Sequence, residues 1–247
     1  MQNMMPSAYG SRVALSTSSV VPYLRRVYAL FTGGVGFAIA GALVALYAGE
    51  PVATSQSGLG APPIVAFGMQ HWFVMMLAFL GVAFGAQAVR RVPGLNVLAL
   101  FVFGFVAGLF IAPSLFIAQV MASQGATLDA SPVRDAFLLS GAAFVGLTSY
   151  VMVTKRDFSF LGAALSMGIW VVIGASILGF FLNSAVLQLA IASVGVLLFC
   201  GYILYDTSRL LRAENEQDPV GAALRLFLDI LNLFLFLLRI LSSSRSR

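Results

Sequence analysis

The chain has 247 residues, of which 60% are hydrophobic and 9% are charged, and its mean hydropathy is +0.97. Soluble domains of this size do not reach such values, so the composition excludes them and indicates an integral membrane protein. The net charge of +5 comes mostly from arginines that flank apolar segments. It therefore reflects membrane topology and contact with anionic lipid, and it does not indicate a nucleic-acid surface.

Thiols and soft metal ligands are scarce in the chain. Cys200 is the single cysteine and His71 the single histidine, so an intrachain disulfide is excluded and a zinc or iron site lacks ligands. Cys200 lies in an apolar run and is predicted to be a packed thiol. We expect no cofactor, and a hard cation held by oxygen atoms remains open.

The apolar segments divide the chain into a membrane domain with two tails. Residues 1–22 are polar and lack the apolar core of a signal peptide, so they are predicted to form a disordered cytoplasmic tail. Residues 23–241 are predicted to form a transmembrane domain and residues 242–247 a short polar tail. The domain is predicted to be all-α, with seven helices that cross the membrane at 27–49, 65–89, 95–121, 136–154, 158–182, 185–211 and 220–241.

Length decides the division between the fifth and sixth of these helices. Residues 158–205 carry no charge, and a single helix of that length would measure about 70 Å, twice what a bilayer accommodates. The stretch must therefore form two spans, and Asn183-Ser184 is the best break between them.

Several residues within the segments predict local features. Pro113 is expected to kink the third helix, because proline removes a backbone hydrogen bond. His71 and Trp72 suit the membrane interface better than a catalytic role. The pairs Gly81-x-x-x-Gly85 and Gly104-x-x-x-Gly108 have the spacing that lets helices approach closely, and they predict a compact bundle.

The distribution of lysine and arginine predicts the orientation in the membrane. With the N-terminus in the cytoplasm, ten basic residues fall inside and four outside. Three of the four exceptions are Arg239, Arg245 and Arg247, at the end of the chain. Either the last helix crosses despite them or it returns without spanning, and crossing is the preferred interpretation. The protein is expected in the inner (plasma) membrane as a multi-pass protein.

Two acids lie well inside apolar runs. Asp206 is six residues before Arg212 and Asp229 nine residues after Val220, so both are predicted roughly 9–14 Å from the same membrane face, where their carboxyl groups can meet. An ionisable residue within a membrane span is a functional candidate, because inserting it costs a few kcal/mol. The structural alternative is an ordinary intrahelical ion pair for each acid, Arg225 with Asp229 and Asp206 with Arg209.

If the two carboxyl groups face each other, they cannot both ionise cheaply and will titrate as a unit. Such a pair can sense pH. Arg90, at the cytoplasmic end of the second segment, has a depth that would let it reach Asp206 and compete with the proton. Protonation would then release the arginine and loosen a bundle that the ionised pair holds shut.

The residues around these acids resemble a known family. Residues 204–207 (LYDT), 226–234 (LFLDILNLF) and 155–161 (KRDFSFL) look like the transmembrane Bax inhibitor motif family, bacterial branch, and the match runs from about Tyr23 to Leu241. The resemblance implies seven helices with the last one central and six around it, and a pH-sensitive calcium leak governed by an aspartate pair. The pair falls on Asp206 and Asp229, and the latching arginine on Arg90, with Arg91 beside it.

The chain departs from the family pattern at two positions. Phe79 stands where some relatives have a membrane glutamate, so a second acidic contribution to an ion path is missing. Arg225 stands where a small polar residue is expected, and it can neutralise the pair and weaken cation access. Some bacterial relatives lack the aspartate pair and are linked to a membrane-bound quality-control protease. This chain keeps both acids, which favours the leak.

Coordination chemistry limits the calcium hypothesis. Calcium takes six to eight oxygen ligands at about 2.3–2.6 Å, and two carboxylates supply at most four. Asn232, backbone carbonyls or water would have to complete the shell around Asp206 and Asp229, so the metal site would be weak and transient, as suits a conduit for ions.

The leading hypothesis is therefore a pH-sensitive cation (calcium) leak channel gated by the aspartate pair. The alternative is a non-transporting interaction protein that modulates a membrane protease or a stress response, for which residues 1–22 would serve as the binding segment. Enzymatic activity is not expected, because His71 lies near the opposite face from the acids, although aspartyl intramembrane proteolysis remains formally open. The expected partners are the lipid bilayer and a membrane protein, and no nucleic acid.

Overall fold

Helices account for almost all of the computed structural model, because backbone polar groups within a bilayer have to be satisfied inside each segment. The structure describes residues 17–53, 60–90, 92–123, 131–182, 184–212 and 218–244. A two-stranded antiparallel pair, β1 (Val52–Ala53) and β2 (Gly60–Ala61), and a 3-10 turn, η1 (Ser159–Leu161), accompany the helices. The helices are α1 (Thr17–Tyr47), α2 (Pro63–Gln70), α3 (Trp72–Ala88), α4 (Leu95–Ser123), α5 (Pro132–Thr154), α6 (Gly162–Leu182), α7 (Ala185–Leu211) and α8 (Pro219–Ser244).

The predicted all-α membrane class is confirmed at this level. Within the described ranges, α1, α4, α5, α6 and α7 are each long and apolar enough to cross a membrane, and α2 with α3 would make a sixth span if the bent pair counts as one. The start of α7 coincides with the predicted break, since the Ser184 hydroxyl caps the helix by accepting from the Leu187 N–H at 3.3 Å. Asn183 and residues 1–16 lie outside the described residues.

The second predicted segment is wrong in one respect, because it is two helices and not one. The axes of α2 and α3 differ by 98° at His71, whose backbone (φ −121°, ψ 44°) is not helical. His71 ends one helix by donating its N–H to the Phe67 carbonyl and begins the next by accepting from the Met75 N–H. Gly68 allows α2 to pack closely on α4, because a Cβ there would lie 2.8 Å from the Pro113 ring.

The ends of α1 and α8 also differ from expectation. Helix α1 begins at Thr17, inside the stretch predicted to be a tail, and it contains Pro22. Helix α8 continues to Ser244, past the predicted end of the membrane domain at Leu241. Both helices therefore extend beyond their purely apolar runs, which hydropathy alone does not register.

One of the two glycine motifs forms the predicted close contact. A Cβ on Gly104 would clash with the backbone of Gly34 in α1, and a Cβ on Gly108 with the backbone of Ala38, so α1 and α4 pack with their main chains in contact. A Cβ on Gly81 or Gly85 of α3 would meet no atom within 4 Å, so the same spacing makes no helix contact there. The pair α1–α4 is thus a rigid wall of the bundle.

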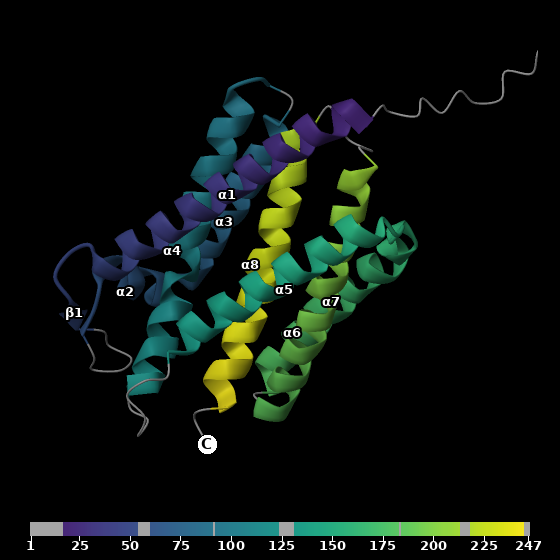
Figure 1. Cartoon of the computed structure of the whole chain (residues 1–247). Helices are drawn as coiled ribbons and strands as arrows, with labels where there is room; N and C mark the ends of the chain where they lie inside the picture. Colours follow the sequence, from purple (N-terminus) through teal and green to yellow (C-terminus); the bar gives the residue numbers. More distant parts are fainter. Residues whose placement is uncertain are drawn as a thin grey trace, which may run out of the picture.

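Helix α8 lies among several others. It packs against α1, α4, α5 and α7, and Figure 1 shows it (yellow) between α1 and α4 on one side and α5 and α7 on the other. Phe227 of α8 contacts Phe103 of α4 edge to face, with ring centroids 5.8 Å apart. Asp218 caps α8 by accepting from the Gly221 N–H at 2.8 Å, so the helix that carries Asp229 is held at its start and along its length.

Candidate functional site

Asp206 lies in the last two turns of α7 and Asp229 about three turns into α8. Asp206 and Asp229 are only 6% and 5% exposed, and their carboxyl groups lie within interaction range of each other. A hydrogen bond between two carboxyl groups requires a proton on one of them. The antiparallel packing of α7 on α8 thus brings together the two acids that the sequence places at matched depth.

One oxygen of this pair has no donor. Oδ2 of Asp229 is buried and receives no hydrogen bond from any group in the described part of the chain. Leaving a buried acceptor unsatisfied typically costs about 1–3 kcal/mol, and such atoms in native proteins mark strain or a site that something else occupies. A proton, a water molecule or a cation would satisfy this oxygen.

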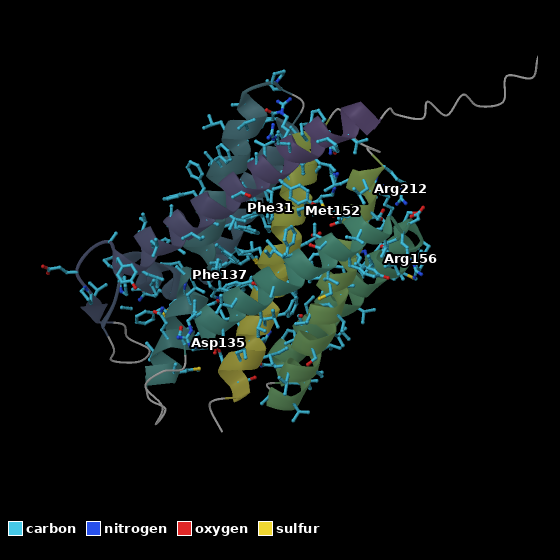
Figure 2. All side chains as sticks on the ribbon, in the orientation of Figure 1. Phe31, Asp135, Phe137, Met152, Arg156 and Arg212 are labelled. Atoms are coloured by element: carbon cyan, nitrogen blue, oxygen red, sulfur yellow. The ribbon has the colours of Figure 1, made fainter. Side chains whose placement is uncertain are left out.

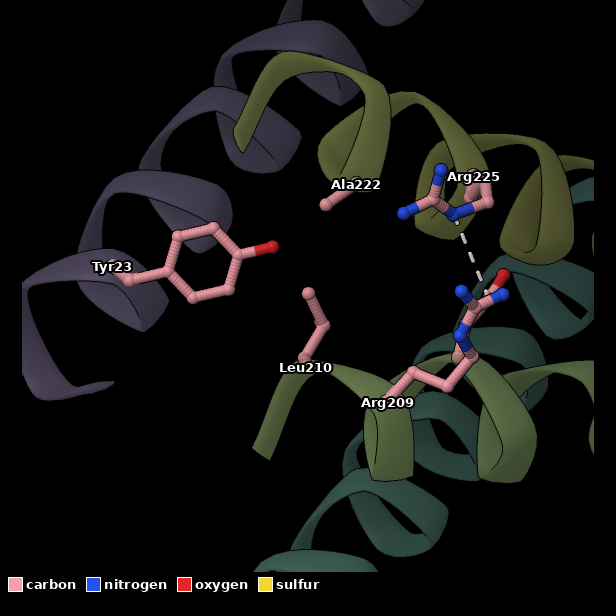
Figure 3. Close-up of a pocket in the computed structure, with 6 residues that line it drawn as sticks. Tyr23, Arg209, Leu210, Ala222 and Arg225 are labelled. Atoms are coloured by element: carbon pink, nitrogen blue, oxygen red, sulfur yellow. Dashed lines mark ion pairs between the residues drawn. The ribbon is translucent and has the colours of Figure 1, made fainter. Parts of the chain in front are cut away.

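Arg225 pairs across the helices and not along its own. Its Nε lies 3.7 Å from Oδ1 of Asp206 on α7, and Figure 3 marks this ion pair with a dashed line. The Arg225 side chain is 35% exposed, whereas that of Asp206 is 8% exposed. The guanidinium therefore bridges the buried acid and the surface, which differs from the intrahelical pair with Asp229 that spacing allowed.

Arg209, the other local cation, is engaged by its own helix. Its Nη1 donates to the Tyr205 hydroxyl at 3.2 Å, and its guanidinium carbon lies 5.4 Å from the centre of the Tyr205 ring. It still contributes positive charge near Asp206. Two arginines, one on each helix, thus place positive charge beside Asp206.

A small pocket lies beside Asp206, between α1, α7 and α8. It is lined by Asp206, Arg209, Arg225, Leu210, Ala222 and Tyr23, and has room for little more than a water molecule or a bare ion. Figure 3 shows the Tyr23 hydroxyl pointing into it from α1. Sequence reasoning missed Tyr23, because the only signal is an aromatic hydroxyl at the start of the first apolar segment, with nothing that relates it to α7.

The remaining predicted residues lie elsewhere. Arg90 follows α3, which packs chiefly against α4, and its carbonyl accepts from the Asn96 side chain at 3.1 Å. In the described structure the ion pair of Asp206 is with Arg225, so a latch at Arg90 stays a prediction, and Arg91 lies outside the described residues. Asn232 donates to the Leu228 carbonyl at 2.7 Å and faces a second groove beside α6. Phe79 stacks on Phe110, with centroids 4.7 Å apart.

The loop between α5 and α6 is fastened to the end of α7. Arg212 places Nη1 2.7 Å from Oδ1 of Asp157, and the Ser208 hydroxyl accepts from the Phe158 N–H at 3.3 Å. Hydrogen bonds from Ser159, aided by Arg212, hold the pKa of Asp157 below its ordinary value of 3.8. Arg156 and Arg212 lie at the same end of the molecule in Figure 2. We call these contacts the loop clamp; they fix the turn of α7 next to Asp206.

The donor set suits a weakly held hard cation. Among the described residues no third His, Cys, Asp or Glu side chain joins the aspartate pair to make a metal cluster. Two carboxyl groups and a tyrosine hydroxyl offer only oxygen, as calcium prefers, but fewer atoms than its shell requires. Any bound cation would keep part of its water.

The fold and the site define a multi-pass helical membrane protein with a buried aspartate pair. The family described as "Inhibitor of apoptosis-promoting Bax1" matches residues 20–246. The chain belongs to this family, so the predicted membership of the Bax inhibitor motif family is confirmed.

Three similar proteins show how widely this family is distributed. An uncharacterized membrane protein of Vibrio cholerae is 37% identical over 191 residues, which is 76% of this chain and 79% of the relative. The Golgi anti-apoptotic protein of vaccinia virus is 32% identical over 240 residues, 97% of this chain and 93% of the relative. Protein lifeguard 4 of mouse is 38% identical over 170 residues, which is 69% of this chain and 67% of the relative.

Proposed function

We propose that the chain is a pH-sensitive cation leak channel, with calcium as the permeant ion and the aspartate pair as its gate. The observation that carries the proposal is the pair of neighbouring buried carboxyl groups, in which one oxygen, Oδ2 of Asp229, meets no hydrogen-bond partner among the described residues. A gate has to offer a place where a proton and a cation compete.

The groups around the pair decide whether protonation opens or closes the gate. Arg225 faces it from α8, Arg209 and Tyr202 from α7, and Tyr23 from α1. While Asp206 is ionised, its ion pair with Arg225 ties α7 to α8 near the pocket. Protonation of Asp206 removes that attraction, and the two helices can separate enough to admit a hydrated cation. Arg90 would serve as a second latch if α3 moves toward α7.

The proposed architecture has seven spans with the last one central. In it, α2 and α3 form one broken span, and α8 crosses the membrane with the other six around it. The contacts of α8 with α1, α4, α5 and α7 support this arrangement. The N-terminus would lie in the cytoplasm of a bacterial cell and the protein in its inner membrane, as the distribution of basic residues favours.

Calcium flux into liposomes tests the gate. We expect the full-length protein to conduct with a rate that depends on pH, and Asp206→Asn and Asp229→Asn each to lose that dependence, because neither variant can exchange the shared proton. The matched control is Glu50→Gln, which removes an exposed acid from the loop after α1. Unchanged pH dependence in both aspartate variants would refute the proposal.

The alternative role as an interaction protein is separated by a deletion. Removing residues 1–16 leaves α1 intact, since the helix begins at Thr17. A leak channel keeps its flux after this deletion. A protein that acts by binding a membrane protease or a stress-response partner through the tail loses that binding, and it shows no flux in liposomes with or without the tail.

A further inference from the structure

A long apolar groove runs between α1 and α5, on the side of α8 away from the acid pair. Its walls are α1 with α4 on one side and α5 on the other, and it has a volume of about 510 Å³. The floor is a stripe of α8 formed by Phe227, Ile230, Leu231 and Phe234. These residues recur at the spacing of one helix face. We call this feature the α1–α5 groove.

The groove is closed at one end and polar at the other. Phe31 of α1 and Phe144 of α5 stack with ring centroids 4.8 Å apart, and this contact closes the groove near the middle of the bundle. Arg134, Ser131 and Gln119 line the opposite end, where α5 begins and α1 ends. Figure 2 labels Phe31 toward the closed end and Phe137 toward the polar end.

The length of the groove matches one leaflet. Along α1 it extends from Val35 to Tyr47, which at about 1.5 Å per residue is roughly 18 Å. Half of a hydrocarbon core of about 30 Å is about 15 Å. A partner transmembrane helix would need a seam across the full thickness, and the Phe31–Phe144 stack interrupts any such seam. A water molecule in the apolar part of the groove would find few hydrogen-bond partners.

The polar end has the chemistry of a lipid headgroup site. The Arg134 side chain is 60% exposed and places Nε 3.3 Å from Oδ1 of Asp135. A planar guanidinium at the end of an apolar groove suits a phosphate group. We infer that the α1–α5 groove binds an acyl chain of an anionic phospholipid from the leaflet at the end of α1, with the phosphate beside Arg134.

The site places a lipid against the back of the helix that carries Asp229. At 3.6 residues per turn, Phe227, Ile230, Leu231 and Phe234 lie on one face of α8, and Arg225 and Asp229 on the opposite face. A chain in the groove supports α8 from behind while α7 contacts it in front. The lipid site does not depend on ion conduction, and it stands or falls by its own test.

Native mass spectrometry of the full-length protein provides that test. The protein is reconstituted into vesicles with equal parts of phosphatidylglycerol and phosphatidylcholine, extracted in a mild detergent and weighed with its retained lipids. We expect wild type to retain phosphatidylglycerol and Ala42→Phe, which fills the groove, to retain about tenfold less, equivalent to about 1.4 kcal/mol. The matched control is Ala40→Phe, because Ala40 is an exposed residue on the same helix outside the groove, and it should retain as much as wild type.

Two further variants guard the interpretation. Ile39→Trp fills the same groove from a position that is 44% exposed, so it tests the site even if Ala42→Phe does not fold. Arg134→Gln should retain lipid but lose the preference for phosphatidylglycerol over phosphatidylcholine. Equal retention by Ile39→Trp and Ala40→Phe, a retained mass that is detergent or free fatty acid, or no retained lipid in wild type would each overturn the inference.

Discussion

Arg225 is the residue that distinguishes this acid pair from a simple carboxyl dimer. It stands on α8, one turn before Asp229, yet its closest carboxylate oxygen belongs to Asp206 on α7, at 3.7 Å. Water screens charges poorly inside a helical bundle, so the attraction between the guanidinium and the carboxylate is stronger there than in open solvent. Removing one partner of such a pair leaves an uncompensated charge. Arg225 therefore both stabilises ionised Asp206 and occupies the place that a permeant cation would take.

This dual position predicts the effect of removing the charge. We expect Arg225→Gln to increase calcium flux into liposomes at neutral pH several-fold. A change of this size needs only about 1 kcal/mol, because a tenfold change corresponds to about 1.4 kcal/mol. The neutral side chain no longer competes with calcium for the carboxylates. Flux is measured with an entrapped calcium indicator in vesicles of equal protein content.

Two variants define what the result means. Arg225→Lys keeps the charge, so its calcium flux should stay close to that of wild type. Arg212→Gln removes an arginine from the loop clamp at the same end of the bundle and should leave flux at neutral pH unchanged. If Arg225→Gln conducts no better than Arg225→Lys, the arginine does not compete with the cation.

At the level of helices, the contact between α1 and α4 is the tightest in the bundle. Gly108 faces the backbone of Ala38 and Ala42 with no room for a Cβ, whereas Gly85 of α3 faces open space. We expect Gly108→Ala to destabilise the protein by about 1–3 kcal/mol through overpacking. Gly85→Ala should be neutral or slightly stabilising, because alanine favours a helix over glycine by about 1 kcal/mol. Thermal unfolding in detergent compares the two, and equal melting temperatures would show that the helices can move apart.

The loop clamp between α5, α6 and α7 has its own pH behaviour. Because hydrogen bonds from Ser159 and the charge of Arg212 lower the pKa of Asp157 below 3.8, its contribution to stability is present above that value and is lost as the pH falls through the lowered pKa. We expect Asp157→Asn to lower the melting temperature slightly at neutral pH, with a difference from wild type that vanishes in strong acid. The calcium flux of Asp157→Asn should keep the wild-type pH profile. A shifted profile would show that the loop clamp is part of the pH sensor.

The whole molecule shows which features a sequence can predict. The span of α7 follows from an uncharged run and a capping serine, and the matched depth of the two acids follows from counting residues from one loop. The bend at His71 does not, because apolar residues continue on both sides of it and the close packing of Gly68 on Pro113 involves another helix. The ion-pair partner of Arg225 could not be predicted either, because residue spacing along α8 does not show which face of α8 packs against α7.

The course of α8 through the bundle decides the topology of the C-terminus. Its start shares a pocket with Tyr23 near the beginning of α1, and Leu238 near its end packs in one cluster with Ala42 near the end of α1. Arg239 donates to the Gln188 side chain, in the first turn of α7, at 2.9 Å. Helix α8 thus runs the length of α1, and the basic residue near its end has a polar partner on that side.

Cysteine labelling tests whether this course is a crossing. In a Cys200→Ser background, single cysteines are placed at Glu50, after α1, at Lys155, after α5, and at Ser243, at the end of α8. Because α8 runs parallel to α1, we expect Ser243→Cys and Glu50→Cys to react with a membrane-impermeant maleimide from one side, and Lys155→Cys from the other. Labelling after permeabilisation controls for burial. If Ser243→Cys reacts from the same side as Lys155→Cys, α8 returns to the face where it began, and the bundle has six crossings around a re-entrant helix.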